Sequence, residues 1–241
     1  MRQYELSTLT FEQKVLGKID TVILPIGTIE AHGPHCPLGT DALIPVELAE
    51  RVEALLGEDQ VLIAPPVNYG HSWYLGPFPG TVDVSIEVLG AYLTEIGRSF
   101  LKWGLKNIIL LNGHGGNAAA LSIASERLAD AGATTLSINW WVDYKKEILE
   151  ICTAQGHAGE DETATVMAIR PEWVDLWVVG EANYGRPFGD IKAKDIEKVT
   201  YPGAYSSDPK LASVEKGQRI VEAVAQALAA HVRRLKAGDF R

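Results

Sequence analysis

Short apolar runs rich in β-branched residues alternate with longer amphipathic segments along most of the chain. Continuous apolar runs of four to seven residues are typical of strands that are covered on both faces of a parallel sheet. The expected strands are residues 21–25, 61–64, 107–111 and 134–139, and the expected helices are residues 44–56, 86–103, 118–131, 162–169 and 214–236. Residues 180–212 are expected to be mostly irregular. Repeated strand–helix units predict an α/β fold of three layers, a mostly parallel central sheet flanked by helices.

Length and composition limit the class of protein further. With 241 residues, of which 46% are hydrophobic and 22% charged, the chain can bury a substantial core, and we expect one domain spanning residues 1–241. No apolar stretch is long enough to cross a membrane. The net charge of −9 repels phosphate backbones and disfavours nucleic-acid binding. Two cysteines give no disulfide framework and suit a cytoplasmic protein.

The first candidate site is the Gly- and Pro-rich segment that follows the first expected strand, residues 27–41. Glu30 and His32 are two residues apart, so in an extended segment their side chains point the same way and could ligate zinc, manganese or iron. Alternatively, Glu30 is solvated and His32 is a turn residue. Asp41 fits either a metal ligand or the N-cap of the following helix.

The second candidate site is Asn112–Asn117, NGHGGN, directly after the third expected strand. Its three glycines allow a sharp turn and a close backbone approach to a ligand, with His114 at the turn. The segment matches neither GxGxxG nor GxxxxGK[ST], which disfavours a nucleotide-phosphate loop.

The third candidate site is His157–Thr163, HAGEDET, at the start of a short expected helix. Its acids suit a helix N-terminus electrostatically. Alternatively, His157 and a carboxylate five residues later form an acid–base and ligand pair.

Other reactive side chains carry weaker signals. His71 is a candidate for lining a substrate pocket, whereas His231 lies in the expected last helix and fits a structural role. No GxSxG segment is present in the sequence, which disfavours a Ser–His–Asp triad. Cys36 beside His35 is a lesser candidate nucleophile, and Cys152 fits packing.

Four segments in this order resemble the creatininase (creatinine amidohydrolase) family: LPIGTIEAHGPHCPLGTD at Leu24–Asp41, FPGT at Phe78–Thr81, NGHGGN and HAGEDET. The resemblance spans residues 21–169. It implies a creatininase-like α/β fold, a site for two divalent ions, hydrolysis of a C–N bond and a homo-oligomer, commonly a hexamer.

The resemblance also implies roles for individual residues. Glu30, Asp41 and His114 are expected to hold one ion, and His32 with the bridging Asp41 the second. Creatininase itself has a glutamate where this chain has Gly116, and we expect Glu162 to supply the missing carboxylate. Other expected site residues are His157 as the active-site histidine, Glu162 or alternatively Glu160 as the base, and His71, Ser72, Gly115 and Trp141 as substrate contacts.

The expected function is therefore metal-dependent hydrolysis of an amide, cyclic amide or formamide in a small polar molecule. A hydroxide that bridges two ions (Zn, Mn or Fe) would attack the carbonyl carbon. Two alternatives remain at this point: hydrolysis of a cyclic ketone of the keto-inositol kind at the same centre, and a non-catalytic metal-containing binding protein.

Overall fold

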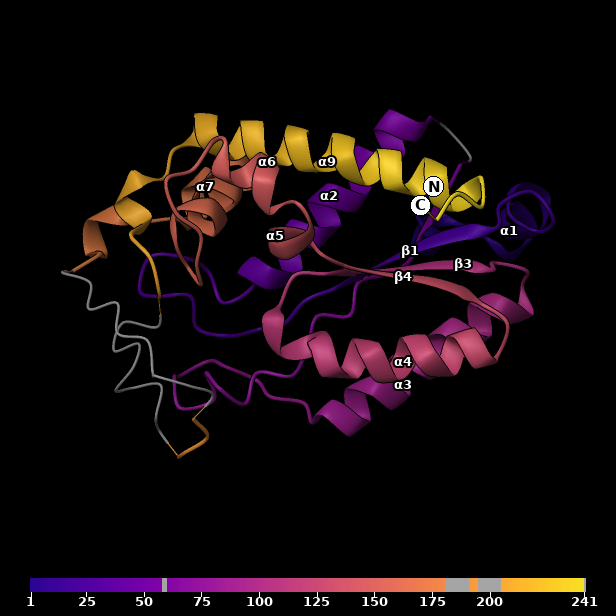
Figure 1. The fold of residues 1–241 in the computed structure, drawn as a ribbon, viewed down its shortest axis with the longest axis horizontal. Coiled ribbons are helices and arrows are strands. Elements are labelled where there is room, and N and C mark those ends of the chain that lie inside the picture. Colours follow the sequence, from indigo (N-terminus) through magenta and orange to yellow (C-terminus); the bar gives the residue numbers. More distant parts are fainter. Residues whose placement is uncertain (58–59, 181–190, 195–204, 241) are drawn as a thin grey trace.

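The computed structural model describes residues 1–57, 60–180, 191–194 and 205–240 (Figure 1). Within them, four parallel strands form one sheet in the order β2-β1-β3-β4. The strands are β1 (Thr21–Ile26), β2 (Leu62–Ile63), β3 (Asn107–Asn112) and β4 (Thr134–Asn139). The helices are α1 (Thr8–Lys14), α2 (Thr40–Leu56), α3 (Ile86–Lys102), α4 (Ala118–Asp130), α5 (Trp140–Asp143), α6 (Lys145–Leu149), α7 (Glu160–Ile169) and α9 (Val214–Lys236).

Alternate strand residues supply two hydrophobic cores, one on each face of the sheet. Ile23 and Ile109 pack with α2 and α9, whereas Val22 and Ile108 pack with α3 and α4. Figure 1 shows the first pair of helices above the sheet and the second pair below it. Because side chains alternate across a strand and both faces are covered, the strands are apolar throughout, as the sequence pattern predicted.

Most element bounds match the expectation to within two residues, and β4 and α9 match it at both ends. The exception is α2, which begins at Thr40 rather than Ile44. Pro45 lies inside this helix and interrupts the pattern from which a helix start is read. Asp41 is therefore in the first turn of α2 and is not its N-cap, a position that Gly39 occupies.

Other segments either differ from the expected secondary structure or lie outside the described residues. The short helices α1, α5 and α6 were not expected. The side chain of Ser7 caps α1 by accepting a hydrogen bond from the backbone N–H of Thr10. The predicted irregular region, residues 180–212, lies mainly outside the described residues. None of the helices in the described part of the chain has the length and apolarity needed to span a bilayer.

The connections place β1 and β3 at a topological switch point. The chain leaves the carboxyl end of β1 toward α2 on one face of the sheet, and it leaves the carboxyl end of the neighbouring β3 toward α4 on the other face. In open parallel sheets, ligands bind in the crevice that such a reversal opens. The first two candidate sites of the sequence lie in these two connections.

Candidate functional site

Two glycines allow α2 to bring Asp41 between the ends of β1 and β3. A Cβ atom at Gly27 would lie 2.4 Å from the carbonyl oxygen of Asp41, and one at Gly113 would lie 2.0 Å from the same oxygen. Real Cβ atoms do not approach backbone this closely, so both positions require glycine. Gly27 and Gly113 thus allow the backbone after each strand to approach the backbone of α2 closely.

The asparagines of NGHGGN connect the loops around the site. Asn112 donates to the side-chain oxygen of Asn139 at 2.8 Å and accepts from the N–H of His114 at 3.1 Å. Asn117 donates to the carbonyl of Gly27 at 3.2 Å and accepts from the N–H of His71 at 2.8 Å. These bonds hold the carboxyl ends of three strands and the loop before α3 in one arrangement.

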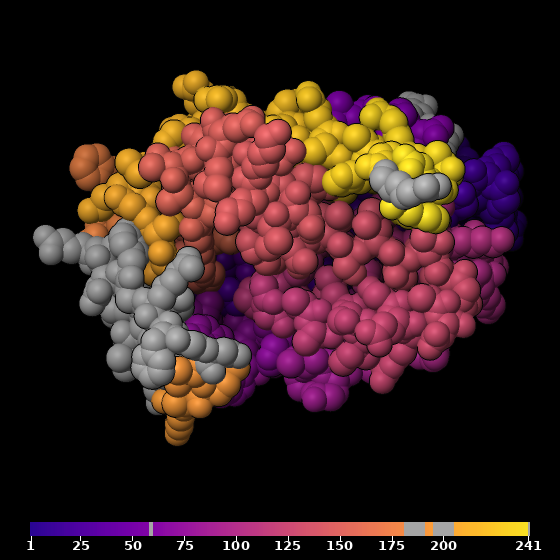
Figure 2. All heavy atoms as spheres, in the orientation of Figure 1, coloured from indigo at the N-terminus to yellow at the C-terminus, as the bar shows by residue number. Residues whose placement is uncertain are grey.

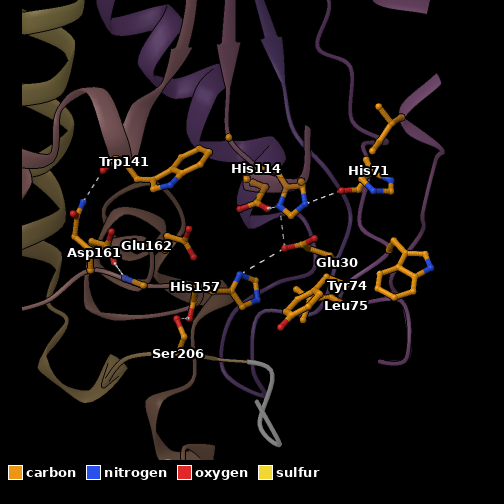
Figure 3. Close-up of a pocket in the computed structure, with 18 of the residues that line it drawn as sticks. Glu30, His71, Tyr74, Leu75, His114, Trp141, His157, Asp161, Glu162 and Ser206 are labelled. Carbon is orange, nitrogen blue, oxygen red and sulfur yellow. Dashed lines mark hydrogen bonds and ion pairs between the residues drawn. The ribbon is translucent and has the colours of Figure 1, made fainter. Parts of the chain in front are cut away.

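Glu30, Asp41 and His114 form the first group that could hold a metal ion. His114 Nδ1 lies 3.2 Å from Glu30 Oε1 and 2.9 Å from Asp41 Oδ2. Both carboxylates are buried. Three ligand atoms from three different segments therefore point at one position, as Figure 3 shows for His114 and Glu30.

His32, Asp41 and Glu162 form the second group. His32 Nε2 lies 3.0 Å from Asp41 Oδ1 and 3.6 Å from Glu162 Oε2. Asp41 thus presents one oxygen to each group, so its carboxylate is placed as a bridge between two positions. A third overlapping group, among the described residues, combines Glu30 and His32 with His157.

Each of the three imidazoles is oriented by a backbone carbonyl. His32 Nδ1 bonds the carbonyl of Glu30 at 3.1 Å, His114 Nε2 that of His71 at 2.9 Å, and His157 Nε2 that of Ala31 at 2.8 Å. A carbonyl only accepts, so each of these nitrogens carries the proton. The other nitrogen of each ring faces the cluster, where the neutral ring presents a lone pair, which is the arrangement of a metal-ligating histidine.

The electrostatics of the cluster favour bound cations. Burial on its own would lower the pKa of His32, but the surrounding carboxylates, Asp41 foremost, raise it to about 10. The pKa of His114 is likewise raised, against burial, by Glu30 and Asp41. When the facing nitrogen of His114 is unprotonated, Glu30 Oε1 and Asp41 Oδ2 are, among the described residues, buried oxygens without a hydrogen-bond donor. Such oxygens are costly unless a cation neutralises them, so the nitrogen and oxygen ligands here fit divalent ions.

Glu162 and His157 come from one strained turn. Ala158 has a φ of 49°, and its N–H donates to Glu162 Oε2 at 2.6 Å. Burial, followed by the charge of Asp41, raises the pKa of Glu162 well above its usual value. Burial and then His32 lower the pKa of His157 to about 4, so this imidazole is neutral near pH 7.

Glu160 lies in a different environment from the one expected of a base. Its carboxylate is buried, contacts Lys216 Nζ and accepts from the N–H of Thr153 at 2.8 Å. It belongs to none of the three candidate metal groups among the described residues. Since α7 turns Glu160 toward α9 and Glu162 toward the cluster, we correct the expectation that Glu160 is an alternative base.

Gly116 leaves no room for a side chain, including the glutamate that the family resemblance implied for this position. A Cβ atom there would lie 2.1 Å from the carbonyl oxygen of His71 and 2.5 Å from His114 Nε2. The bond between these two groups is the one that orients His114. A side chain at position 116 would therefore displace a ligand of the first group, and the carboxylate of the second group comes from Glu162 instead.

A pocket of about 890 Å³ opens onto the cluster. Aromatic side chains form part of its wall, and Figure 3 shows Trp141 and Tyr74 on opposite sides of the histidines. In the space-filling view, indigo atoms are visible at the bottom of a hollow between the segment that carries α5 and α6 and the purple segment before α3 (Figure 2). Its lining includes Glu30, Asp41, His71, Trp73, Tyr74, His114, Gly115, Trp141, Gln155, His157, Asp161, Glu162 and Ser206.

Three of the four expected substrate contacts, His71, Gly115 and Trp141, line this pocket. Ser72 does not: it is buried, and its hydroxyl donates to Glu30 Oε2. The expectation that Ser72 binds substrate is therefore corrected, because its hydroxyl is used to orient a candidate ligand.

Sequence reasoning missed several lining residues, among them Trp73, Tyr74, Gln155, Asp161 and Ser206. Asp161 stands among the acids of HAGEDET and could have been found there. Ser206 lies within the region expected to be irregular, and its N–H donates to the carbonyl of His157 at 2.8 Å. No local signal marks such a residue, because its position depends on how the chain returns before α9.

The two cysteines do not have the properties of nucleophiles. Burial raises the pKa of Cys36 to about 12, and it likewise raises that of Cys152 to about 12. Both thiols are buried, and neither is a thiolate near pH 7. His231 contacts Tyr144, with 3.0 Å between Nδ1 and the phenol oxygen, in agreement with a structural role.

The chain is similar to several named enzymes. The family described as "Creatininase: Creatinine amidohydrolase" matches residues 4–232. A mycofactocin precursor peptide peptidase of Mycolicibacterium smegmatis is 33% identical over 90% of this chain and 85% of its own length. A 3-dehydro-scyllo-inosose hydrolase of Thermotoga maritima is 31% identical over 90% of this chain and 78% of its own length.

Solved structures agree with these sequence similarities. A mutant creatininase of the "Zn-Zn type" has a TM-score of 0.84 and 27% identity, covering 97% of both chains. A creatininase described with Mn has a TM-score of 0.83 and 27% identity over the same shares. The expected three-layer α/β fold is confirmed.

Proposed function

The chain belongs to the creatininase family of metal-dependent amidohydrolases, and from that premise we propose that it hydrolyses a C–N bond of an amide, cyclic amide or formamide in a small polar molecule. The observation that carries the proposal is the sharing of Asp41 by two buried ligand groups, Glu30–Asp41–His114 and His32–Asp41–Glu162. Family membership also makes the chain an enzyme, so a non-catalytic binding protein is set aside.

The proposed centre takes two divalent ions, one in each group. When bound, such ions polarise a carbonyl oxygen and acidify water, which is the chemistry that amide hydrolysis needs at neutral pH. Glu162 is assigned as the third ligand of the second group, because its Oε2 faces His32 Nε2 at 3.6 Å and Gly116 has no side chain. Zn, Mn and Fe all suit this set of imidazoles and carboxylates.

His157 is assigned the proton transfer. Its Nε2–H is held by the carbonyl of Ala31, so Nδ1 has the free lone pair, and this atom lies 3.6 Å from Glu30 Oε1. Nδ1 takes the proton of the attacking water and passes it to the leaving nitrogen. The neighbouring carboxylate of Glu30 stabilises the imidazolium between the two transfers. Trp141 and His71 in the pocket wall orient the substrate above the cluster.

The direct test is to offer the purified protein, loaded with Zn or Mn, a panel of formamides, lactams, short peptides and cyclic ketones. Mass spectrometry would identify the products. We expect addition of one water to a C–N compound, and His157→Gln should lower kcat by about 10²–10⁴-fold. Full activity of that variant would contradict the assigned role of His157, and the absence of any C–N product would contradict the proposal.

A second candidate function is supported by the similarity to the keto-inositol hydrolase over 90% of this chain. The same ligand groups would then act on a carbonyl carbon of a cyclic ketone, with cleavage of a C–C bond. In the same panel, ring opening of the cyclic ketones without turnover of any amide would favour this function over the first.

A further inference from the structure

We propose that His35 is a positioning residue, which acts through the backbone of Ala158 to hold both His157 and Glu162 in place. It touches neither the candidate ligand groups nor the pocket, and no part of the mechanism above uses it. The inference rests on the proposed roles of His157 and Glu162, but its geometry is independent of the substrate.

The turn at Ala158 is where the two active-site groups meet. Ala158 follows His157 directly, and its N–H donates to Glu162 Oε2 at 2.6 Å. It is the one non-glycine residue with a positive φ among the residues that the structure describes. A side chain is disfavoured in this conformation, so the surrounding structure must hold it there.

His35 makes the shorter of two side-chain hydrogen bonds to the carbonyl of this turn, to which Thr163 Oγ1 also donates at 3.4 Å. His35 Nε2 lies 3.1 Å from the carbonyl oxygen of Ala158 and 3.1 Å from Thr163 Oγ1. The carbonyl accepts, so Nε2 carries the proton and donates to it. Ala158 thus donates to Glu162 through its N–H and accepts from His35 through its carbonyl, so the two bonds fix the peptide planes on either side of Ala158.

The ring of His35 is itself confined. It is 2% exposed and packs edge-on against Tyr205, with ring centroids 5.8 Å apart. On another side lies Gly33, where a Cβ atom would be only 2.6 Å from His35 Nδ1. A ring held on these sides keeps its donor aimed at Ala158, and it connects the segment that carries His32 to the turn that carries His157.

The required group is a donor at the position of Nε2. Glutamine places an amide nitrogen near that position, whereas asparagine is too short and leucine has no donor. His35→Gln should therefore preserve the turn, and His35→Asn and His35→Leu should release it. Because glycine adopts a positive φ without steric cost, adding Ala158→Gly to His35→Leu should recover part of the loss.

The test compares these variants, loaded with Zn or Mn, by steady-state kinetics on whichever substrate the panel identifies. We expect His35→Leu and His35→Asn to lower kcat about tenfold with KM unchanged, and His35→Gln to stay within about threefold of the wild type. His231→Leu is the matched control, because it removes a histidine whose contact is with Tyr144 and not with the turn. It should leave kcat unchanged. Equal kcat values in His35→Leu and His35→Gln would overturn the proposal.

A second measurement does not depend on turnover. Amide hydrogen exchange, read by mass spectrometry over residues 157–163, should be faster in His35→Leu than in the wild type and close to wild type in His35→Gln. Unchanged exchange in His35→Leu would refute the positioning role even if kcat fell. If the wild type hydrolysed no C–N compound, the proposed function would fail, while the exchange measurement would still decide the role of His35.

Discussion

Gly116 is a position at which the addition of a single Cβ atom would disturb the candidate site. We predict that Gly116→Ala lowers the free energy of unfolding by about 1–3 kcal/mol, as overpacking does. It should also lower metal content, because the added Cβ would displace His114 from the carbonyl of His71. Chemical denaturation and elemental analysis measure the two effects.

Gly115→Ala is the matched control for stability and metal content. A Cβ atom at Gly115 would meet only the ring of Trp141, at 3.7 Å, an ordinary contact. We expect this variant to differ from the wild type by no more than about 0.5 kcal/mol. Similar losses in both variants would mean that the close contacts at Gly116 do not matter.

A pH prediction concerns His35. Burial lowers its pKa from 6.5 to about 4 in the folded chain. Between these pH values His35 is protonated in the unfolded chain but not in the folded chain. The wild type therefore loses stability as pH falls from about 6.5 to 4. His35→Gln cannot take up this proton. Its free energy of unfolding should fall less steeply, by up to about 1.4 kcal/mol per pH unit.

Urea titrations of both metal-free proteins between pH 4 and 7.5 check this difference. Groups that titrate in both proteins cancel in the comparison. Parallel curves for the wild type and His35→Gln would show that His35 titrates normally in the folded chain.

Residue types and spacing were sufficient to indicate which side chains gather at the site, but not how each one is used. The expected ligands Glu30, His32, Asp41 and His114 do converge. The function of Ser72 as a donor to Glu30 was not predictable, since it depends on the approach of a loop from 42 residues away. Local sequence carries no information about such a partner.

At the scale of elements, α7 and α9 are joined by a charge pair between a buried carboxylate and a partly exposed lysine. Glu160 of α7 is buried and contacts Lys216 of α9. Lys216→Met would leave the Glu160 carboxylate with backbone N–H donors alone. We predict a loss of about 1–3 kcal/mol in the free energy of unfolding, a range that allows for the partial exposure of the lysine. Metal content should stay at the wild-type level, because neither residue faces the cluster.

Lys210→Met serves as the control, since this side chain is exposed and outside the pair. It should unfold at the denaturant concentration of the wild type. If both lysine variants were equally stable, the pair would contribute nothing. If Glu160→Gln abolished turnover without changing stability, Glu160 would have the catalytic role that was first expected of it.

The type of each element was predictable from the periodicity of apolar residues. The ends of an element were predictable where a capping residue or a following glycine marks them. The helix α9 has Ser213 as its N-cap and Gly238 beyond its end, and both bounds were expected. The start of α2 was not, because Pro45 inside the helix masks it. That difference places Asp41 in the first turn of a helix, where Gly27 and Gly113 let it approach the strands.

At the scale of the whole molecule, the site follows from the order of strands. The reversal of direction between β1 and β3 brings the two motif-bearing connections to one crevice, and Glu162 of the third motif, at the start of α7, joins them there. Strand order depends on contacts between distant parts of the chain. The sequence therefore predicted that the motifs lie at the carboxyl edge of the sheet, but it did not predict which strands pair. We propose that residues 1–241 form one domain, because both hydrophobic cores are built on this one sheet.

The measurement that tests the central claim most directly is the number of divalent ions per chain in the wild type and in Asp41→Asn. Native mass spectrometry after loading with Zn and removal of free metal would count them. Asp41 offers one oxygen to each ligand group, and an amide cannot supply two anionic oxygens. We predict two ions per chain in the wild type and loss of both from Asp41→Asn. Two ions retained by the variant, or a single ion in the wild type, would contradict a centre bridged by Asp41.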